Sequence, residues 1–275
     1  MRRAFADRTA LVTGAASGIG AALAEALAER GARVWLTDID AEAVGATAAA
    51  IGQRHPSSPT AHAPLDVTDA EAFADVVRRI EAEGPIDYLF NNAGVGLAGE
   101  LRDLSPADWR TVLAVNLDGT VNGVHAVYPA MVERGAGHIV NIASGAALAP
   151  RPGMVPYASA KAAVVALSRS LRAEAAGLGV RVSAVCPGFI DTGIMDRTRY
   201  VGLDGQGLQA SIPIRPISAA ECARRTLVGV AKNRGLIPVG AEVTWEWRLM
   251  RFAPRLVDRV ARWRAGQFRR HRTTA

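Results

Sequence analysis

The sequence predicts a single α/β domain, built on a parallel sheet of seven strands with helices on both faces, and a C-terminal amphipathic basic helix. Short apolar runs alternate with longer helical stretches, which is typical of a parallel sheet. The 275 residues are 49% hydrophobic, enough to bury one large core. We expect strands near residues 9–13, 33–37, 61–65, 86–90, 137–143, 180–185 and 236–239, and helices near residues 18–30, 41–54, 69–83, 106–134, 155–178 and 219–232. In this interpretation residues 1–243 form the domain and residues 244–275 form a tail.

The first strand leads directly into a glycine-rich turn. The apolar run 9–13 is followed by Gly14, Gly18 and Gly20, and then by a stretch rich in Ala, Leu and Glu. Gly14 permits a tight turn, Gly18 lets the backbone approach a pyrophosphate, and Gly20 lets the helix pack closely on the strand. The N-terminus of that helix offers free N–H groups and a positive dipole end to phosphates. The segment predicts a Rossmann-type dinucleotide site.

The second strand ends at Asp38, 18 residues after Gly20. A carboxylate at this distance typically accepts hydrogen bonds from the adenosine ribose and repels a 2′-phosphate. Ala16, Ser17 and Ile39 offer no cation that would bind such a phosphate. The sequence therefore predicts NAD as the cofactor rather than NADP. The alternative is that Asp38 or Asp40 only caps the next helix.

Two later helices have clear N-terminal signals. Ser105 followed by Pro106 predicts a capped helix with proline at its first position. Thr68 and Glu71 have the spacing of a capping box. If that box forms, Asp66 is left free to contact a ligand.

Tyr157 and Lys161 stand four residues apart at the head of a predicted helix, so both side chains lie on one face. A cation beside a phenol favours the phenolate and so lowers the phenol pKa. Lys161 is one of only two lysines in a chain that otherwise uses arginine. The pair is a candidate for acid–base catalysis. The alternative is an ordinary i,i+4 pair on the helix surface.

These segments resemble the classical short-chain dehydrogenase/reductase family over roughly residues 6–240. The matching motifs are Thr13-Gly14-x-x-x-Gly18-Ile19-Gly20, Asp66-Val67, Asn91-Asn92-Ala93-Gly94, Asn116, Ser144 placed 13 residues before Tyr157, and the run from Pro187 to Thr192. Taken singly, each also fits an ordinary turn, cap or buried polar residue. The resemblance implies NAD-dependent hydride transfer between a nicotinamide and a secondary alcohol or ketone, in a homodimer or homotetramer.

The resemblance also implies the site residues. Tyr157 would act as the acid–base group, Ser144 would hold the substrate oxygen, Lys161 would lower the Tyr157 pKa and bind the nicotinamide ribose, and Asn116 would seat a water on the proton path. The cofactor set is Gly14, Ser17, Gly18, Ile19, Gly20, Asp38, Asp66, Val67, Asn92, Ala93, Gly94, Tyr157, Lys161, Pro187, Gly188, Ile190 and Thr192. A non-catalytic NAD-binding regulator, a membrane-docked scaffold, and an epimerase or dehydratase are the alternatives, which the complete catalytic set and the glycine spacing disfavour.

Residues 189–217 are expected to form a lid over the substrate. Besides Ser144 and Tyr157, the substrate candidates are Ala146, Met154, Phe189 and Met195. Their apolar character favours a lipophilic substrate, such as a steroid, a terpenoid or a fatty-chain compound. The alternative is that these side chains only pack the lid. Arg197 and Arg199 would meet an acidic head group or be solvated.

The remaining composition excludes several classes. Two cysteines imply no disulfide framework, no metal-ligand cluster stands out, and no apolar run is long enough to span a membrane, so we expect a cytoplasmic protein. Residues 248–275 carry nine arginines and one aspartate, so the net charge of +6 belongs to the tail alone. No nucleic-acid-binding module accompanies this charge.

The tail has a helical pattern that Pro254 interrupts or restarts. Its apolar residues recur every three or four positions, at Leu249, Phe252, Leu256, Val260 and Trp263, and arginines follow another face, at Arg251, Arg255, Arg259 and Arg262. Three interpretations stay open. The tail lies on an anionic membrane surface, it docks on a partner subunit or closes over the site, or it is solvated with its apolar face on its own body.

Overall fold

The computed structural model describes residues 2–211 and 215–273, and it confirms the predicted α/β architecture. The central sheet has seven parallel strands in the order β11-β7-β6-β4-β1-β2-β3. They are β1 (Thr9–Thr13), β2 (Arg33–Asp38), β3 (Thr60–Pro64), β4 (Tyr88–Asn91), β6 (Gly137–Ile142), β7 (Val180–Pro187) and β11 (Leu236–Val239). The strand order reverses between β1 and β4, and ligands of such sheets bind at the carboxyl ends of the strands beside this reversal.

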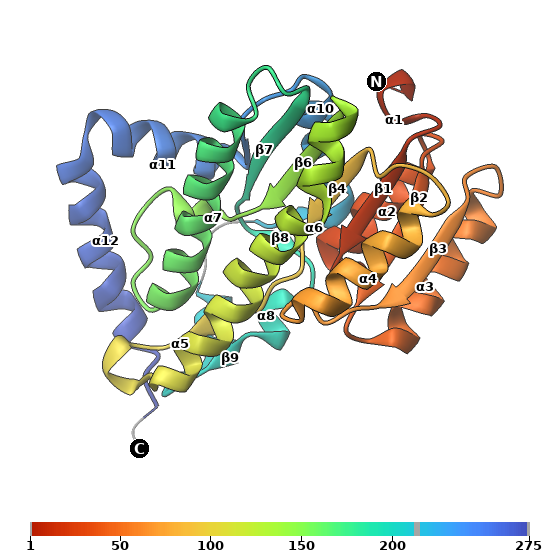
Figure 1. Ribbon diagram of the computed structural model, residues 1–275. Coiled ribbons are helices and arrows are strands. Elements are labelled where there is room, and N and C mark those ends of the chain that lie inside the picture. Colours follow the sequence, from red (N-terminus) through yellow and green to blue (C-terminus); the bar gives the residue numbers. More distant parts are fainter. Residues whose placement is uncertain (1, 212–214, 274–275) are drawn as a thin grey trace.

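Helices cover both faces of the sheet (Figure 1). On one face lie α2 (Gly18–Ala28), α3 (Ala41–Arg54) and α10 (Ala219–Ala231), and on the other lie α4 (Ala70–Glu81), α6 (Gly119–Arg134) and α7 (Val155–Glu174). Adjacent residues of β1 serve the two cores in turn: Ala10 and Val12 pack with α2, and Leu11 packs with α4. A strand buried on both sides explains the unbroken apolar run in the sequence.

The helix predicted over residues 106–134 is divided in the structure. It consists of α5 (Pro106–Leu113), a π-helical segment η2 (Ala114–Asp118) and α6. Ser105 and Asp108 form a capping box at its start, with Pro106 at the first position, as predicted. A π turn accommodates one extra residue and is frequent at functional sites. Here it contains Asn116.

The capping box predicted at Thr68 and Glu71 is wrong. Asp69 caps α4 instead, because its carboxylate accepts hydrogen bonds from the backbone N–H groups of Glu71 and Ala72 at 3.0 and 2.9 Å. The side chain of Thr68 turns back and donates to Asp66 Oδ1 at 2.8 Å. Sequence spacing alone did not distinguish two adjacent residues that can both cap a helix.

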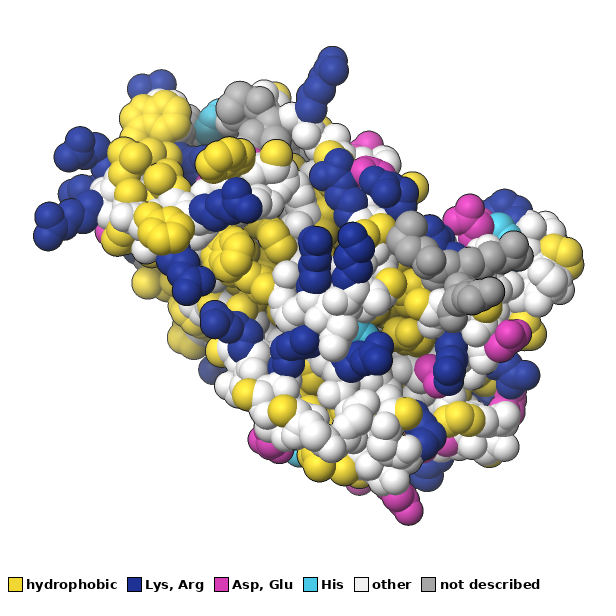
Figure 2. Space-filling model, turned by 90° about the horizontal axis from the view of Figure 1, so that it is seen from above, with side chains coloured by type: hydrophobic (Ala, Val, Ile, Leu, Met, Phe, Trp, Pro, Cys, Tyr) yellow, Lys and Arg dark blue, Asp and Glu magenta, His cyan; other side chains and the backbone are white. Residues whose placement is uncertain are grey.

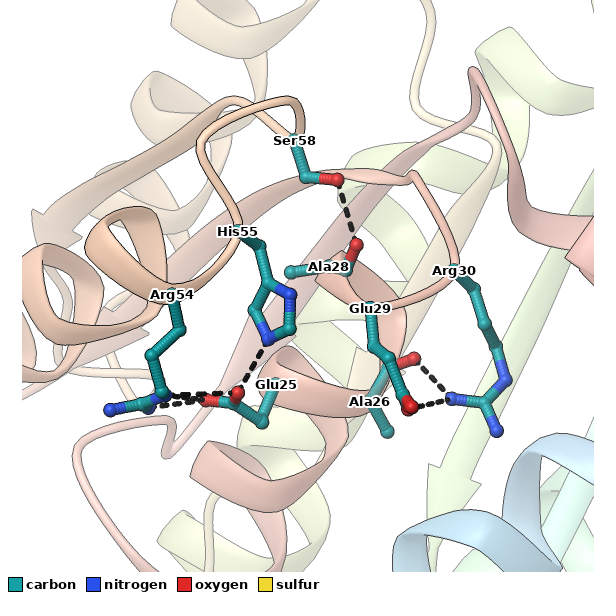
Figure 3. Close-up of polar contacts among 8 residues, drawn as sticks. All are labelled: Glu25, Ala26, Ala28, Glu29, Arg30, Arg54, His55 and Ser58. Atoms are coloured by element: carbon teal, nitrogen blue, oxygen red, sulfur yellow. Dashed lines mark hydrogen bonds and ion pairs between the residues drawn. The ribbon is translucent and has the colours of Figure 1, made fainter.

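The C-terminal ends of α2 and α3 are joined by polar contacts (Figure 3). Glu25 accepts hydrogen bonds from the Arg54 guanidinium and lies 2.6 Å from His55 Nε2. Ser58 Oγ donates to the carbonyl of Ala28 at 2.7 Å. The hydrogen bond from Arg54 is the largest cause that lowers the pKa of Glu25 below its usual range. These contacts fix the first two helices that follow the glycine loop.

Short elements form the segment predicted as the lid, residues 189–217, of which residues 212–214 lie outside the described part. They are β8 (Ile190–Asp191), α8 (Ile194–Arg197), β9 (Arg199–Tyr200), α9 (Gly205–Ala210) and β10 (Ile217–Ser218), and β9 pairs with β5 (Leu97–Ala98). Further one-turn helices are α1 (Arg2–Phe5), η1 (Leu101–Asp103) and η3 (Gly145–Ala147). The lid is thus tied to the loop that follows β4.

The tail forms two helices, α11 (Ala241–Phe252) and α12 (Pro254–Arg269), which break at Ala253 before the predicted proline. They lie at one side of the molecule beside α7, and α12 runs down toward η1 (Figure 1). Val243 is buried in the core, so the boundary predicted at residue 243 falls inside α11.

The imidazole of His138 in β6 makes folding sensitive to acid. It is buried, with Nε2 2.8 Å from Ser183 Oγ, and burial lowers its pKa to about 3, with Arg181 and Arg172 contributing. Between the ordinary pKa of 6.5 and the folded pKa of about 3, only the unfolded chain binds a proton at His138. The free energy of unfolding is therefore unaffected by this group above pH 6.5 and falls as the pH drops toward 3. Protonation of His138 in the unfolded chain should lower the free energy of unfolding by about 2 kcal/mol as the pH falls from roughly 6.5 to 5.

Urea unfolding of His138→Gln and wild type at both pH values checks this prediction. The stability difference between the two proteins should change by that amount, while His62→Gln, which alters an exposed histidine of β3, should show no such change. A difference that is the same at both pH values would contradict the assignment.

Candidate active site

The glycine loop has a shape that only glycine allows. Gly14 has a φ of +63°, and a Cβ added at Gly20 would lie 2.1 Å from the carbonyl oxygen of Gly14. Asn92 holds the loop from the neighbouring strand, because its Nδ2 donates to the carbonyls of Thr13 and Gly14 at 3.0 Å each. The narrow turn before α2 therefore fits the pyrophosphate of a dinucleotide.

Asn92 also shows how the predicted motif after β4 works. The backbone N–H groups of Asn92 and Ala93 donate to Thr13 Oγ1 at 3.0 and 3.1 Å. Asn91 is buried and donates to Asn141 Oδ1 at 2.9 Å. The asparagines therefore join strands and support the loop, which places Ala93 against Gly14.

Asp38 and Asp40 have separate partners. Asp40 is the N-cap of α3, since its carboxylate accepts from the N–H of Ala43 at 3.0 Å. Asp38 Oδ2 accepts from the N–H of Ala16 at 3.0 Å, and Oδ1 accepts from the N–H of Asp40 at 3.2 Å. The interpretation of Asp38 as the helix cap is therefore wrong, and its carboxylate faces the glycine loop.

Asp66 and Val67 follow β3 at the same edge of the sheet. Asp66 is exposed, and its Oδ1 accepts from both the N–H and the hydroxyl of Thr68. Val67 is buried against Gly119, and its carbonyl accepts from Asn122 at 2.9 Å. Asp66 Oδ1 is thus engaged in a local turn, and the assignment of Asp66 to the cofactor stays a prediction.

Gly94, Asn116 and Lys161 meet at one point. A Cβ on Gly94 would lie 2.6 Å from Asn116 Oδ1 and 3.4 Å from Lys161 Nζ. Asn116 is fully buried and bonds the backbone of Val95 twice, at 3.1 and 2.9 Å. Lys161 Nζ donates to the carbonyl of Ile142 at 2.9 Å, and burial lowers its pKa to about 8.

Tyr157 lies one turn before Lys161 on α7 and is half-buried. Burial raises the pKa of its phenol, and a hydrogen bond with Ser144 offsets part of the rise. The sequence predicted the opposite net direction, with Lys161 lowering this pKa. Desolvation prevails because the Lys161 ammonium is directed to the backbone of Ile142.

The run after β7 approaches the glycine loop. Pro187 ends β7, and the N–H of Gly188 donates to Val239 at 2.8 Å. Ile190 is buried in β8, and Thr192 lies so close to Gly18 that an added Cβ there would be 3.1 Å from its Cβ. This places Thr192 beside the start of α2.

One cation near the loop was missed by sequence reasoning. Arg197 from α8 donates to Ser17 Oγ at 2.8 Å and lies 3.4 Å from the carbonyl of Thr192. The sequence had offered no cation beside Ser17, because the two residues are 180 positions apart. Arg199 pairs with Asp108 at 2.7 Å. Arg197 and Arg199 therefore have protein partners.

The other predicted residues are placed around the same end of the sheet. Ile19 packs against the core of the α2 face, Ala146 is buried in η3, and Phe189 and Met195 are half-buried at the lid. Met154 packs with Leu203 and with Phe268 of α12, a contact that the sequence did not suggest. A cavity of about 340 Å³ beside α12 is lined by Gly153 and Phe268 among others, but by none of the predicted catalytic residues.

Neither a metal-ligand cluster nor a membrane-spanning helix stands out in the described part of the chain. Within residues 2–211 and 215–273, His, Cys, Asp and Glu side chains nowhere gather in threes as a metal site would need. Over the same ranges, each helix is too short or too polar to cross a bilayer.

A parallel sheet that carries this glycine loop and this Tyr–Lys helix is characteristic of one family. The chain belongs to the short-chain dehydrogenase family, whose model matches residues 8–200. This confirms the family that the motifs predicted.

Curated relatives extend the comparison. The chain is 38% identical over 272 residues to the probable oxidoreductase EphD of Mycobacterium tuberculosis, which covers 94% of this chain and 45% of that protein. The chain thus spans less than half the length of that relative. It is 41% identical over 239 residues to D-threitol dehydrogenase of Mycolicibacterium smegmatis, covering 86% of this chain and 90% of the other.

Solved structures agree in fold. A short-chain dehydrogenase/reductase from Burkholderia phymatum in complex with NAD has a TM-score of 0.83 at 31% identity, covering 92% of this chain and 95% of that one. A short-chain dehydrogenase from Sphingobium yanoikuyae in complex with NADPH has a TM-score of 0.78 at 30% identity, covering 90% and 94%. Relatives of this fold therefore bind either cofactor.

Proposed function

We propose that the protein is an NAD-dependent oxidoreductase that interconverts a lipophilic secondary alcohol and its ketone. The observation that carries the proposal is the convergence of Ser144, Tyr157 and Lys161 at the carboxyl end of β6, next to the loop of Gly14 and Gly20. A site with an acid–base group beside a dinucleotide cradle suits hydride transfer.

Each side chain has an assigned task in the direction of oxidation. Tyr157 Oη takes the proton of the substrate hydroxyl, and Ser144 donates a hydrogen bond to the substrate oxygen. A bound nicotinamide supplies the hydride acceptor. Lys161, whose pKa is about 8 through burial, is largely protonated at neutral pH, and we assign its ammonium to oppose the burial that raises the pKa of Tyr157. Asn116 holds the backbone of Val95 in place, and its role as a water seat stays a prediction.

We assign NAD as the preferred cofactor. The Asp38 carboxylate faces the loop and would repel a 2′-phosphate. Arg197 is the nearby cation that would act in the other direction, but its guanidinium is bonded to Ser17 and to the lid. We therefore expect the Asp38 carboxylate to determine the preference for NAD over NADP.

The lipophilic substrate rests on the lid and its surroundings. Apolar side chains reach this region from Met154, Phe189, Met195 and Phe268, while Arg199 is paired with Asp108. The name of the threitol relative instead suggests a polar polyol. The two classes of substrate are separable by experiment.

A panel of secondary alcohols and ketones of increasing chain length, with polyols of matched size, tests the function by nicotinamide absorbance. KM should fall about fourfold for each methylene that the site buries. A preference for the polyols would contradict the lipophilic substrate. Binding of NAD without turnover of any member would favour the non-catalytic alternative.

We also propose a homodimer or homotetramer in the cytoplasm. Cys186 and Cys222 are buried free thiols, which suits a reducing compartment. Light scattering of the purified protein measures the oligomeric state, and a monomer would contradict it.

A further inference from the structure

The two tail helices present a row of exposed apolar side chains, which we name the tail ridge. It consists of Trp245, Leu249 and Phe252 on α11 and Leu256, Val260 and Trp263 on α12, with exposures from 37% to 82%. Figure 2 shows hydrophobic and basic side chains gathered together at this end of the molecule. Large apolar side chains exposed to water are unfavourable, so a row of them indicates a binding surface.

The ridge is not a surface left over from a loose tail. Another side of the helices is packed through Val243, Val257, Ala261 and Phe268, which are buried. Phe268 fits so tightly against the body that a Cβ on Gly153 would meet its ring at 2.1 Å. The body side of both helices is thus already in contact.

Ion pairs fix the tail in the same orientation. Glu246 of α11 contacts Arg151 of the body and lies 2.8 Å from Arg264 of α12. Arg269 bonds Glu100 at 2.6 Å. With its inner side held in this way, the tail must keep the ridge turned outward.

An arginine stripe, formed by Arg248, Arg251, Arg255, Arg259 and Arg262, borders the ridge. On α12, each arginine of the stripe comes one residue before a residue of the ridge. The pairs are Arg255 and Leu256, Arg259 and Val260, and Arg262 and Trp263, so the two rows lie about 100° apart around the helix. Arg248 also lies over the Trp245 ring at 5.8 Å. Within the described part of the chain, no carboxylate forms an ion pair with any of the five.

The charge pattern decides between partners. A second copy of the chain docked through the same ridge would place both arginine stripes at the border of one contact, because a twofold interface uses the same patch of each subunit. A lipid membrane with an apolar interior and anionic head groups complements both the tail ridge and the arginine stripe. Tryptophan and phenylalanine favour the boundary between lipid tails and head groups, and arginines bind lipid phosphates.

We propose that the tail ridge and the arginine stripe form an interfacial anchor that binds the protein to anionic membranes. Of the three interpretations of the tail, the one that places its apolar face on the body does not hold for the predicted row, because that row is exposed and Val257, Ala261 and Phe268 pack inward instead. The anchor lies flat in the head-group region, since neither helix is apolar enough to span a bilayer.

Co-sedimentation of the full-length protein with phosphatidylglycerol-containing and pure phosphatidylcholine vesicles tests this inference. Binding should require the anionic lipid and weaken as salt rises. Replacing Arg255, Arg259 and Arg262 together by Gln should weaken it roughly 100-fold, since each basic residue near an anionic surface contributes about fivefold. Trp245→Ala with Trp263→Ala should weaken it at every salt concentration.

Arg110→Gln with Arg169→Gln is the control for the loss of surface arginines away from the stripe, because both are exposed on other helices. This variant should bind as the wild type does, and thermal melts should show all variants folded. No binding to anionic vesicles at low salt, or equal losses in the control, would overturn the anchor. If the tryptophan variants instead change the particle mass in vesicle-free light scattering, the ridge is a contact between copies and the membrane assignment is wrong.

Discussion

Tyr157→Phe should retain the fold and bind the cofactor, yet lose at least about two orders of magnitude in turnover, the usual share of a general acid–base group. The change removes only the hydroxyl, which is the atom assigned to the proton transfer. The half-buried ring still packs in its cluster with Leu97 and Val112. Steady-state kinetics on any substrate that the wild type accepts provides the measurement.

Tyr128→Phe offers a matched control for this loss. Tyr128 lies on α6, and its hydroxyl has no hydrogen-bond partner among the described residues. The same atom is removed, so turnover should be unchanged. Near-normal turnover in Tyr157→Phe would remove Tyr157 from its role, and a comparable loss in Tyr128→Phe would point to a general effect on folding.

Replacing Asp38 by Ala and Ile39 by Arg should shift the ratio of kcat/KM for NADH and NADPH by roughly 100-fold toward NADPH, since one charge interaction near a surface is worth a few kcal/mol. The carboxylate that repels a 2′-phosphate is lost, and a cation is added at Ile39, which is 71% exposed. Both ratios come from initial rates with a common substrate.

Asp40→Ala separates cofactor choice from helix capping. This neighbouring carboxylate caps α3, so its loss should cost about 1 kcal/mol of stability and leave the cofactor ratio unchanged. Arg197→Ala tests the cation that the lid brings to Ser17. A wild type with a lower KM for NADPH than for NADH, reversed by Arg197→Ala, would show that the arginine and not Asp38 decides.

Local patterns predicted most of the fold. The strands were found because each is a short apolar run between turn signals, and a sheet covered on both faces needs such runs. The Gly14 turn was equally readable, because its positive φ and its close contacts demand glycine in any sequence context. The Ser105 cap also depends on neighbours within one helical turn.

Features that depend on contacts between residues far apart in the chain could not be predicted from the sequence. The approach of Arg197 to Ser17 needs the lid to fold across the sheet end. The Tyr157 pKa moved upward because burial, which the spacing to Lys161 does not reveal, outweighs a neighbouring charge. Periodicity found the apolar row of the tail but not its direction, because Val257 and Phe268 pack inward on another side of the same helix.

At the junction between the tail and η1, replacing Glu100 should have a larger effect than replacing one of its arginine partners. Glu100 accepts from Arg102, Arg269 and Arg272, which hold the pKa of its carboxyl near 2, with Arg269 the largest cause. Losing any one arginine leaves the Glu100 carboxylate with two partners, whereas losing Glu100 leaves Arg102 and Arg269 without this carboxylate and Arg272 with Asp103 alone. Replacing any one of these arginines should therefore weaken the junction less than replacing Glu100.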